Sequence, residues 1–147
     1  MEITAFDLAQ RFIGVREIAG QASNPLILSM LKLDDDWPEG DEVPWCSAFI
    51  NYICWLLRLP RSKSLRARSW LDVGRMISLN ELEPRYDIII LKRGQNPTSG
   101  HVGFYAGSSN GFLVHDFIPI LGGNQSDSVK VSMFETKDIL GARRLYQ

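Results

Sequence analysis

The longest apolar pattern in the chain covers residues 43–57 and has helical spacing. Two adjacent apolar stripes run along it, formed by Cys46, Ile50, Ile53 and Leu57 and by Trp45, Phe49, Tyr52 and Leu56. A helix with so little polar surface is buried, so this pattern predicts the core helix of the domain. Pro44 suits the first helical position, because its missing N–H would have no partner there.

Shorter helical patterns surround this segment. Thr4 resembles an N-cap with Asp7 three residues later, and the helix it starts should end at Gly14. Asn24 and Pro25 read as the cap and first residue of a second helix that reaches residue 33. The pair at residues 59–60 ends the core helix, and residues 69–71 predict a further short helix.

The pattern changes from helix to strand after residue 84. Residues 87–91 form a continuous apolar run, and residues 101–107, 112–117, 129–134 and 140–146 predict further strands, with a hairpin connection at 108–111. Helices first and strands afterwards predict an α+β fold, in which N-terminal helices pack on a C-terminal antiparallel β-sheet. The length of 147 residues predicts one domain, residues 1–147.

Composition narrows the class of partner. A net charge of −1 gives no overall attraction to nucleic acid or to anionic membranes, and no stretch is long and apolar enough to insert in a membrane. The two cysteines lie eight positions apart on one predicted helix, about 12 Å by the helical rise, which is too far for a disulfide. Residues 1–7 lack the basic start and apolar run of a secretory signal, so we expect synthesis in the cytoplasm with free thiols.

Cys46 is the candidate nucleophile. It falls in the first turn of the core helix, where free N–H groups and the positive end of the helix dipole favour a thiolate. Cysteines in such positions have lowered pKa values and are reactive. The alternative is a buried core residue, since free cysteine is among the most buried residue types, and this is what we expect of Cys54.

A thiol nucleophile needs a base, and the base needs a residue that orients its ring. His101 opens a predicted strand and shares its face with Gly103, which leaves space beside the imidazole. His115 lies within a strand and should pack in the core. Asn124 follows two glycines in a predicted tight turn and is the expected orienter, whereas Asp116 has no comparable reason to point at His101.

Two charged segments leave alternatives open. Residues 34–42 are dense in carboxylates and read as a solvated loop, or as a calcium site without EF-hand spacing. Arg61, Lys63, Arg66 and Arg68 either form a solvated face or bind phosphates or the carboxylates of an acidic substrate. The cysteines and histidines lack the spacing of zinc ligands, so no metal is predicted.

Several segments together resemble a known family. They are GVREI at 14–18, PWCSAF at 44–49, RSWL at 68–71, HVGFY at 101–105, LGGNQ at 121–125 and GARR at 141–144. The chain is similar to papain-like cysteine amidases of the NlpC and CHAP class, which cut bacterial peptidoglycan, and most of all to small phage and prophage members. One departure is Tyr86 before Asp87, where the family usually has glycine.

This resemblance implies a papain-like NlpC/CHAP-type fold and an endolysin-like hydrolase of amide bonds in peptidoglycan peptides. It implies a triad of Cys46, His101 and Asn124, substrate contacts from Trp45 and Trp70, and no cofactor. We expect a monomer whose partner is peptidoglycan and which reaches the cell wall through a holin, a virion or another delivery route. Two alternatives remain: a thiol acyltransferase with the same catalytic set, and a non-catalytic wall- or protein-binding domain on the same fold.

Overall fold

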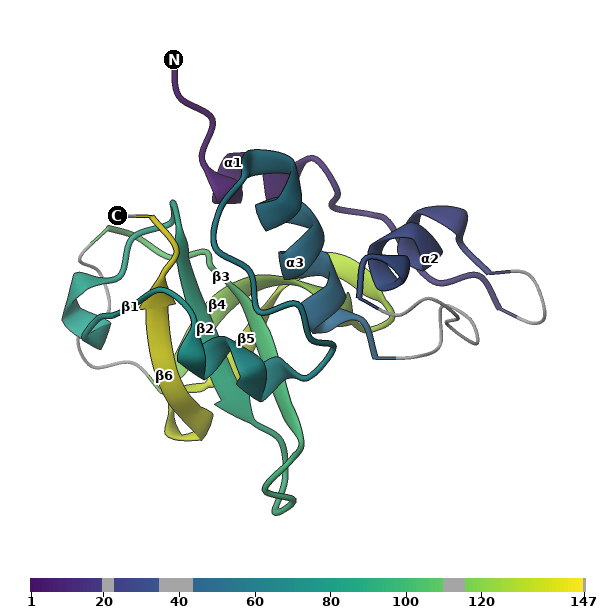
Figure 1. Cartoon of the computed structure of the whole chain (residues 1–147). Helices are drawn as coiled ribbons and strands as arrows, with labels where there is room; N and C mark the ends of the chain where they lie inside the picture. Colours follow the sequence, from purple (N-terminus) through teal and green to yellow (C-terminus); the bar gives the residue numbers. More distant parts are fainter. Residues whose placement is uncertain (20–22, 35–43, 110–115, 147) are drawn as a thin grey trace.

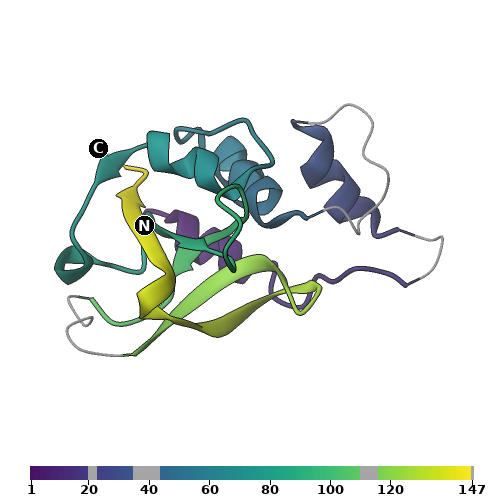
Figure 2. The same cartoon turned by 90° about the horizontal axis from the view of Figure 1, so that it is seen from below.

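The strands form one curved, antiparallel six-stranded sheet in the order β1-β6-β2-β3-β4-β5 (Figures 1 and 2). This architecture comes from a computed structural model that describes residues 1–19, 23–34, 44–109 and 116–146. The strands are β1 Arg75–Met76, β2 Asp87–Lys92, β3 Gly100–Tyr105, β4 Phe117–Gln125, β5 Ser128–Glu135 and β6 Ile139–Arg144. The α+β class expected from the order of the patterns is therefore confirmed.

Three α-helices precede the sheet in the described part of the chain: α1 Ala5–Gln10, α2 Pro25–Lys32 and α3 Cys46–Leu57. The capping box of Thr4 and Asp7 is present, and the Asn24 side chain caps α2 ahead of Pro25, as the sequence predicted. Short 3-10 helices are η1 Ala67–Asp72, η2 Leu79–Glu81 and η3 Thr136–Asp138. None of the helices in the described ranges is long and apolar enough to cross a membrane.

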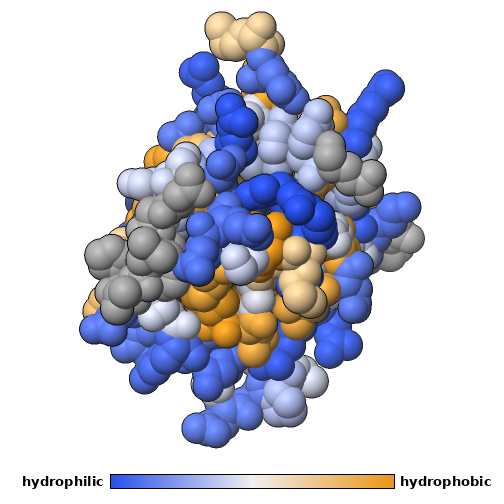
Figure 3. All heavy atoms as spheres, turned by 90° about the vertical axis from the view of Figure 1, so that its left-hand side faces the viewer, coloured by the Kyte–Doolittle hydropathy of each residue, from blue (hydrophilic) through white to orange (hydrophobic). Residues whose placement is uncertain are grey.

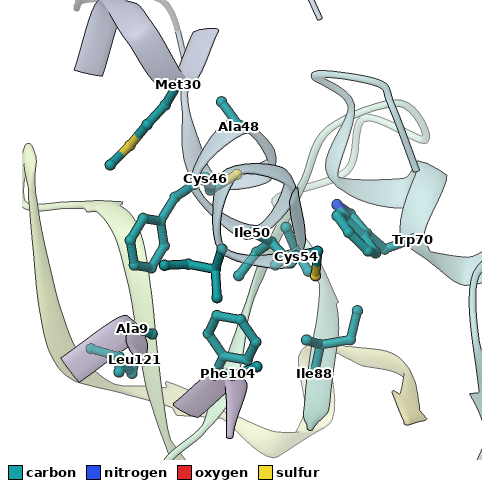
Figure 4. Packing of buried hydrophobic residues seen from close by; sticks show 14 of the residues in the cluster. Ala9, Met30, Cys46, Ala48, Ile50, Cys54, Trp70, Ile88, Phe104 and Leu121 are labelled. Carbon is teal, nitrogen blue, oxygen red and sulfur yellow. The ribbon is translucent and has the colours of Figure 1, made fainter. Parts of the chain in front are cut away.

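The predicted core helix is the central element of the fold. α3 packs on β3 and β4, and α1 and α2 pack against it (Figure 1). Figure 4 shows Ile50 and Cys54 of α3 on the side of the helix that faces Phe104 of β3. A second apolar cluster, which includes Ile89 and Ile120, fills the opposite face of the curved sheet. β3 and β4 therefore carry side chains into two separate layers.

The far edge of the sheet is more open. β1 pairs with β6 over only two residues, and Met76 in β1 is 73% exposed. On the side of the molecule where β1 and β6 lie, Figure 3 shows apolar side chains gathered among hydrophilic ones. This edge lies away from the N-terminus of α3 (Figure 1).

Three details differ from the predictions. α3 begins at Cys46 with Trp45 as its N-cap, so Pro44 precedes the helix instead of opening it. Residues 122–125 belong to β4 and not to a tight turn; the turn follows them at Ser126 and Asp127, whose φ angles are 50° and 60°. β1 and most of β4 were not anticipated. The predicted hairpin and strand at 108–117 fall largely on residues 110–115, outside the described residues.

Candidate active site at the start of α3 and β3

Cys46 is the first residue of α3, and within the described part of the chain no side chain caps the start of this helix. The first intrahelical hydrogen bond at this end runs from the N–H of Phe49 to the carbonyl oxygen of Trp45. The N–H groups of the residues between them therefore have no partner within the helix. An uncapped helix start with a thiol on its first residue is suited to binding developing negative charge.

The Cys46 thiol is buried, as the alternative of a core residue predicted, and its pKa is not lowered as the position at the helix start predicted. The residue is 5% exposed, and burial raises the pKa of the thiol. The backbone N–H groups of Val102, Ser47 and Cys46 lower it, but desolvation is the largest effect. Burial likewise raises the pKa of Cys54 to about 12. The two thiols are free and point in different directions from α3 (Figure 4).

Trp45 and Trp70 are structural supports in this arrangement, which corrects their assignment to substrate binding. Both rings are completely buried, so neither offers a surface to a ligand. The indole N–H of Trp45 donates to Glu17 Oε1 at 2.8 Å, and that of Trp70 donates to Ser47 Oγ at 2.8 Å. Each indole thereby ties the first residues of α3 to a distant part of the chain.

His101 lies near the start of β3 and is 1% exposed. Its Nε2 is 2.9 Å from Gln125 Oε1, and its ring stacks on Phe134 of β5 with ring centroids 4.9 Å apart. Its Nδ1 is buried and has no hydrogen-bond partner among the described residues, Cys46 Sγ included. Burial lowers the pKa of His101 to about 4; the hydrogen bond to Gln125 Oε1 raises the pKa, and the charge of Arg93 lowers it. The imidazole is therefore neutral at pH 7.

The structure brings Cys46 close to the start of β3. The thiol is near enough to the N–H of Val102, the residue after His101, for that group to lower its pKa. The charge of Arg93 acts on both Cys46 and His101. The two residues do not share a hydrogen bond, but nucleophile and base often tighten only when substrate is bound.

The hydrogen bond expected from Asn124 to His101 is made by its neighbour instead. Among the described residues, only Gln125 forms a hydrogen bond with the His101 ring. The reason is an irregularity in β4, where the register with β5 shifts between Gly122 and Gln125. Asn124 is half-buried and has a left-handed backbone, with a φ angle of 59°. Period-two alternation could not locate this shift, since the bulge changes which side chain points toward β3.

The remaining candidates fall into two groups. His115 and residues 35–42 of the acidic loop lie outside the described residues. Asp116 is exposed, and its carbonyl oxygen accepts from the N–H of Thr136. Of the basic cluster, Arg61 pairs with Asp34 at 2.7 Å, and Arg68 donates to the carbonyl oxygen of Ser99. The described residues contain no group of three or more His, Cys, Asp or Glu side chains that could hold a metal ion.

A comparison with solved structures finds a similar fold in NlpC1 from Trichomonas vaginalis. The match has a TM-score of 0.60 and 19% sequence identity, and covers 97% of this chain and 43% of that one. The chain thus has an NlpC-like, papain-like α+β fold and spans less than half of the NlpC1 chain. No family model and no curated protein matches the sequence.

Proposed function

We propose that the protein is a cysteine hydrolase that cleaves amide bonds in the stem or cross-bridge peptides of peptidoglycan, with Cys46 as nucleophile and His101 as base. The observation that carries the proposal is the meeting of two elements. A thiol on the start of α3 lies beside the start of β3, which bears an imidazole with one nitrogen that has no partner among the described residues. The NlpC-like fold and the sequence segments that resemble those of wall amidases support the substrate class.

The reaction follows from the roles of these groups. His101 takes the proton of the Cys46 thiol as the sulfur attacks the carbonyl carbon of the scissile amide. The backbone N–H of Cys46 and the start of α3 stabilise the oxyanion. The imidazolium then protonates the leaving amine as the C–N bond breaks, which leaves a thioester on Cys46. Water, deprotonated by His101, attacks the thioester and releases the acid and the free thiol. These steps require no cofactor.

The thiol and the imidazole both rest in their neutral forms in this scheme. Burial keeps Cys46 protonated and His101 unprotonated at neutral pH, so proton transfer accompanies attack instead of preceding it. We propose that the protein acts as a monomer on the cell wall after delivery by a holin, a virion or another route. The phage origin, the CHAP class and the endolysin role belong to the same proposal.

The test is digestion of purified peptidoglycan, with the released ends identified by mass spectrometry. New amino and carboxyl ends should appear with the wild type and be lost in Cys46→Ala. Cys54→Ala is the matched control, because Cys54 lies on the same helix but is buried away from its start. Equal activity in Cys46→Ala would refute the proposal. An added amine attached to the released carboxyl end would identify acyl transfer in place of hydrolysis.

One observation favours a second candidate, a wall- or protein-binding domain without activity. Cys46 and His101 are 5% and 1% exposed, as residues of a structural core are. This candidate predicts that the wild type and Cys46→Ala bind insoluble peptidoglycan equally and that neither produces new ends. Co-sedimentation measured beside the digestion separates the two functions.

A further inference from the structure

We propose that the cavity between the two ends of the described chain is a second binding site, which takes a free α-amino acid with its ammonium and carboxylate on one carbon. The cavity has a volume of about 330 Å³, which is within the range of small-molecule sites. Its walls come from the N-terminal segment, from the residues just before β2 and from the end of β6. The cavity takes no part in the proposed hydrolysis.

The cavity lies at the end of β2 that is remote from the candidate active site. Tyr86, which lines it, directly precedes β2, and Arg144 is the last residue of β6. His101 pairs instead with Leu91 near the other end of β2, roughly 16 Å away by the rise of a strand. Both ends of the chain lie in the upper left of Figure 1. A ligand in this cavity therefore leaves Cys46 free.

Two side chains of the cavity are held in place before any ligand binds. Tyr86 is 9% exposed, its hydroxyl donates to Glu2 Oε1 at 2.9 Å, and its ring stacks on that of Tyr146 with ring centroids 4.8 Å apart. Arg144 donates to the two carboxylate oxygens of Asp87 at 2.7 and 2.8 Å, and to a backbone carbonyl oxygen at 2.8 Å. Side chains that are already fixed lose little entropy on binding.

The cavity presents charges of both signs. Glu2 and Glu83 contribute carboxylates, and Arg85 and Arg144 contribute guanidinium groups. Among the described residues, Glu83 and Arg85 form no ion pair, and Nη1 of Arg144 lies outside its pairing with Asp87. An ammonium group suits the two carboxylates, and a carboxylate suits the two guanidinium groups. A ligand with only one charge would leave half of these groups unmatched.

The aromatic wall indicates which side chain the amino acid carries. Tyr146 is 49% exposed, so its ring adds apolar surface beside the charged groups. Tyr86, its stacking partner, stands where the resembled family usually has glycine, which would offer no ring. Two tyrosine rings favour a flat, apolar side chain. Phenylalanine is therefore the probe.

The first experiment titrates the ¹⁵N-labelled full chain with L-phenylalanine and follows the backbone amide signals by NMR. We expect the signals of Tyr86, Leu145 and Tyr146 to move together. N-acetyl-phenylalanine lacks the ammonium and phenylalanine amide lacks the carboxylate, so each should bind about tenfold more weakly. Equal binding of either analogue, shifts only at other residues, or no shifts at about 20 mM L-phenylalanine would overturn the proposal.

The second experiment removes one charge at a time from the cavity. Glu83→Gln and Arg85→Gln should each raise the Kd for L-phenylalanine about tenfold, with circular dichroism to confirm folding. The matched control is Glu135→Gln, since that exposed carboxylate lies on β5, three strands from β2, and its loss should leave the Kd unchanged. An unchanged Kd in both folded cavity variants would overturn the proposal. If neither variant folds, the two analogues decide on the wild type.

The third experiment separates this site from the proposed function. Cys46→Ala should bind L-phenylalanine with the wild-type Kd, because the cavity and the thiol lie near opposite ends of β2. A Kd raised about tenfold in folded Cys46→Ala would place the ligand at the active site and overturn the proposal. Binding by a wild type that does not digest peptidoglycan would refute the proposed function and leave the amino-acid site intact.

Discussion

His101 should make the protein sensitive to mild acid. Its pKa falls from an ordinary 6.5 to about 4 because the imidazole is buried, so the native state binds the proton less well than the unfolded chain does. The sign follows from this difference. The stability associated with a neutral His101 is fully present above pH 6.5 and is lost as the pH falls toward 4. Replacing His101 with glutamine removes this titration.

The structure sets the size of the effect. A pKa difference of about 2.5 corresponds to about 3 kcal/mol between pH 7.5 and pH 4, at about 1.4 kcal/mol per tenfold change. The side chain is buried, so solvent screening does not reduce this figure. Carboxylates also titrate over this range, but they do so in both proteins. The difference between the wild type and His101→Gln therefore isolates the imidazole.

Urea unfolding followed by tryptophan fluorescence gives the free energy of unfolding of both proteins at pH 7.5, 6, 5 and 4. Relative to His101→Gln, the wild type should lose about 3 kcal/mol across the series. Most of the loss should occur below pH 6. A difference between the two proteins that stays constant with pH would show that His101 titrates normally in the native state, and the reasoning from burial would fail.

Three further predictions concern α3 and its contacts. The rate at which iodoacetamide alkylates Cys46 should rise about tenfold per pH unit from pH 7 to 9, because burial raises the pKa of the thiol. A rate that reaches a plateau below pH 8 would show that Cys46 is already a thiolate there. Asn51→Ala should lower the free energy of unfolding by about 1–3 kcal/mol, since its buried amide binds Ser47, Ser62, Ser64 and the N–H of Lys63; urea titration measures this. Gly123→Ala should lower the free energy of unfolding by a similar amount, because a Cβ atom at this position would lie 2.6 Å from the Trp45 ring. An unchanged free energy of unfolding would contradict the observed packing.

The sequence predicted the starts of helices where the residues that fix them are neighbours in the chain. The side chain of Thr4 accepts from the N–H of Asp7 and that of Asn24 from the N–H of Leu26, so the starts of α1 and α2 could be predicted from the residues themselves. The core helix was visible because α3 is apolar on most of its surface. Its first residue was misplaced by two positions, because the pattern of side chains does not specify the backbone angles of Trp45.

The burial of Cys46 was one of two alternatives that the sequence left open. The start of a helix favours a thiolate when water or a substrate reaches it, and this argument predicted a lowered pKa for Cys46. The sheet and neighbouring segments instead bury Cys46, and desolvation reverses the sign. The same contacts turn Trp45 and Trp70 from candidate ligand contacts into buried supports. Such effects depend on residues 20 to 80 positions away, which no local pattern contains.

The pair Gly122 and Gly123 shows how a short motif can be recognised in sequence and still be misread. Two consecutive glycines suggested a tight turn, but they lie in a strand and leave space on its two faces. Gly122 makes room for Gln125, which binds His101, and Gly123 makes room for the Trp45 ring, which precedes Cys46. A single β4 segment therefore contacts the supports of both proposed catalytic residues. Because a Cβ at either position would meet a different support, substitutions there can separate the placement of the thiol from that of the imidazole.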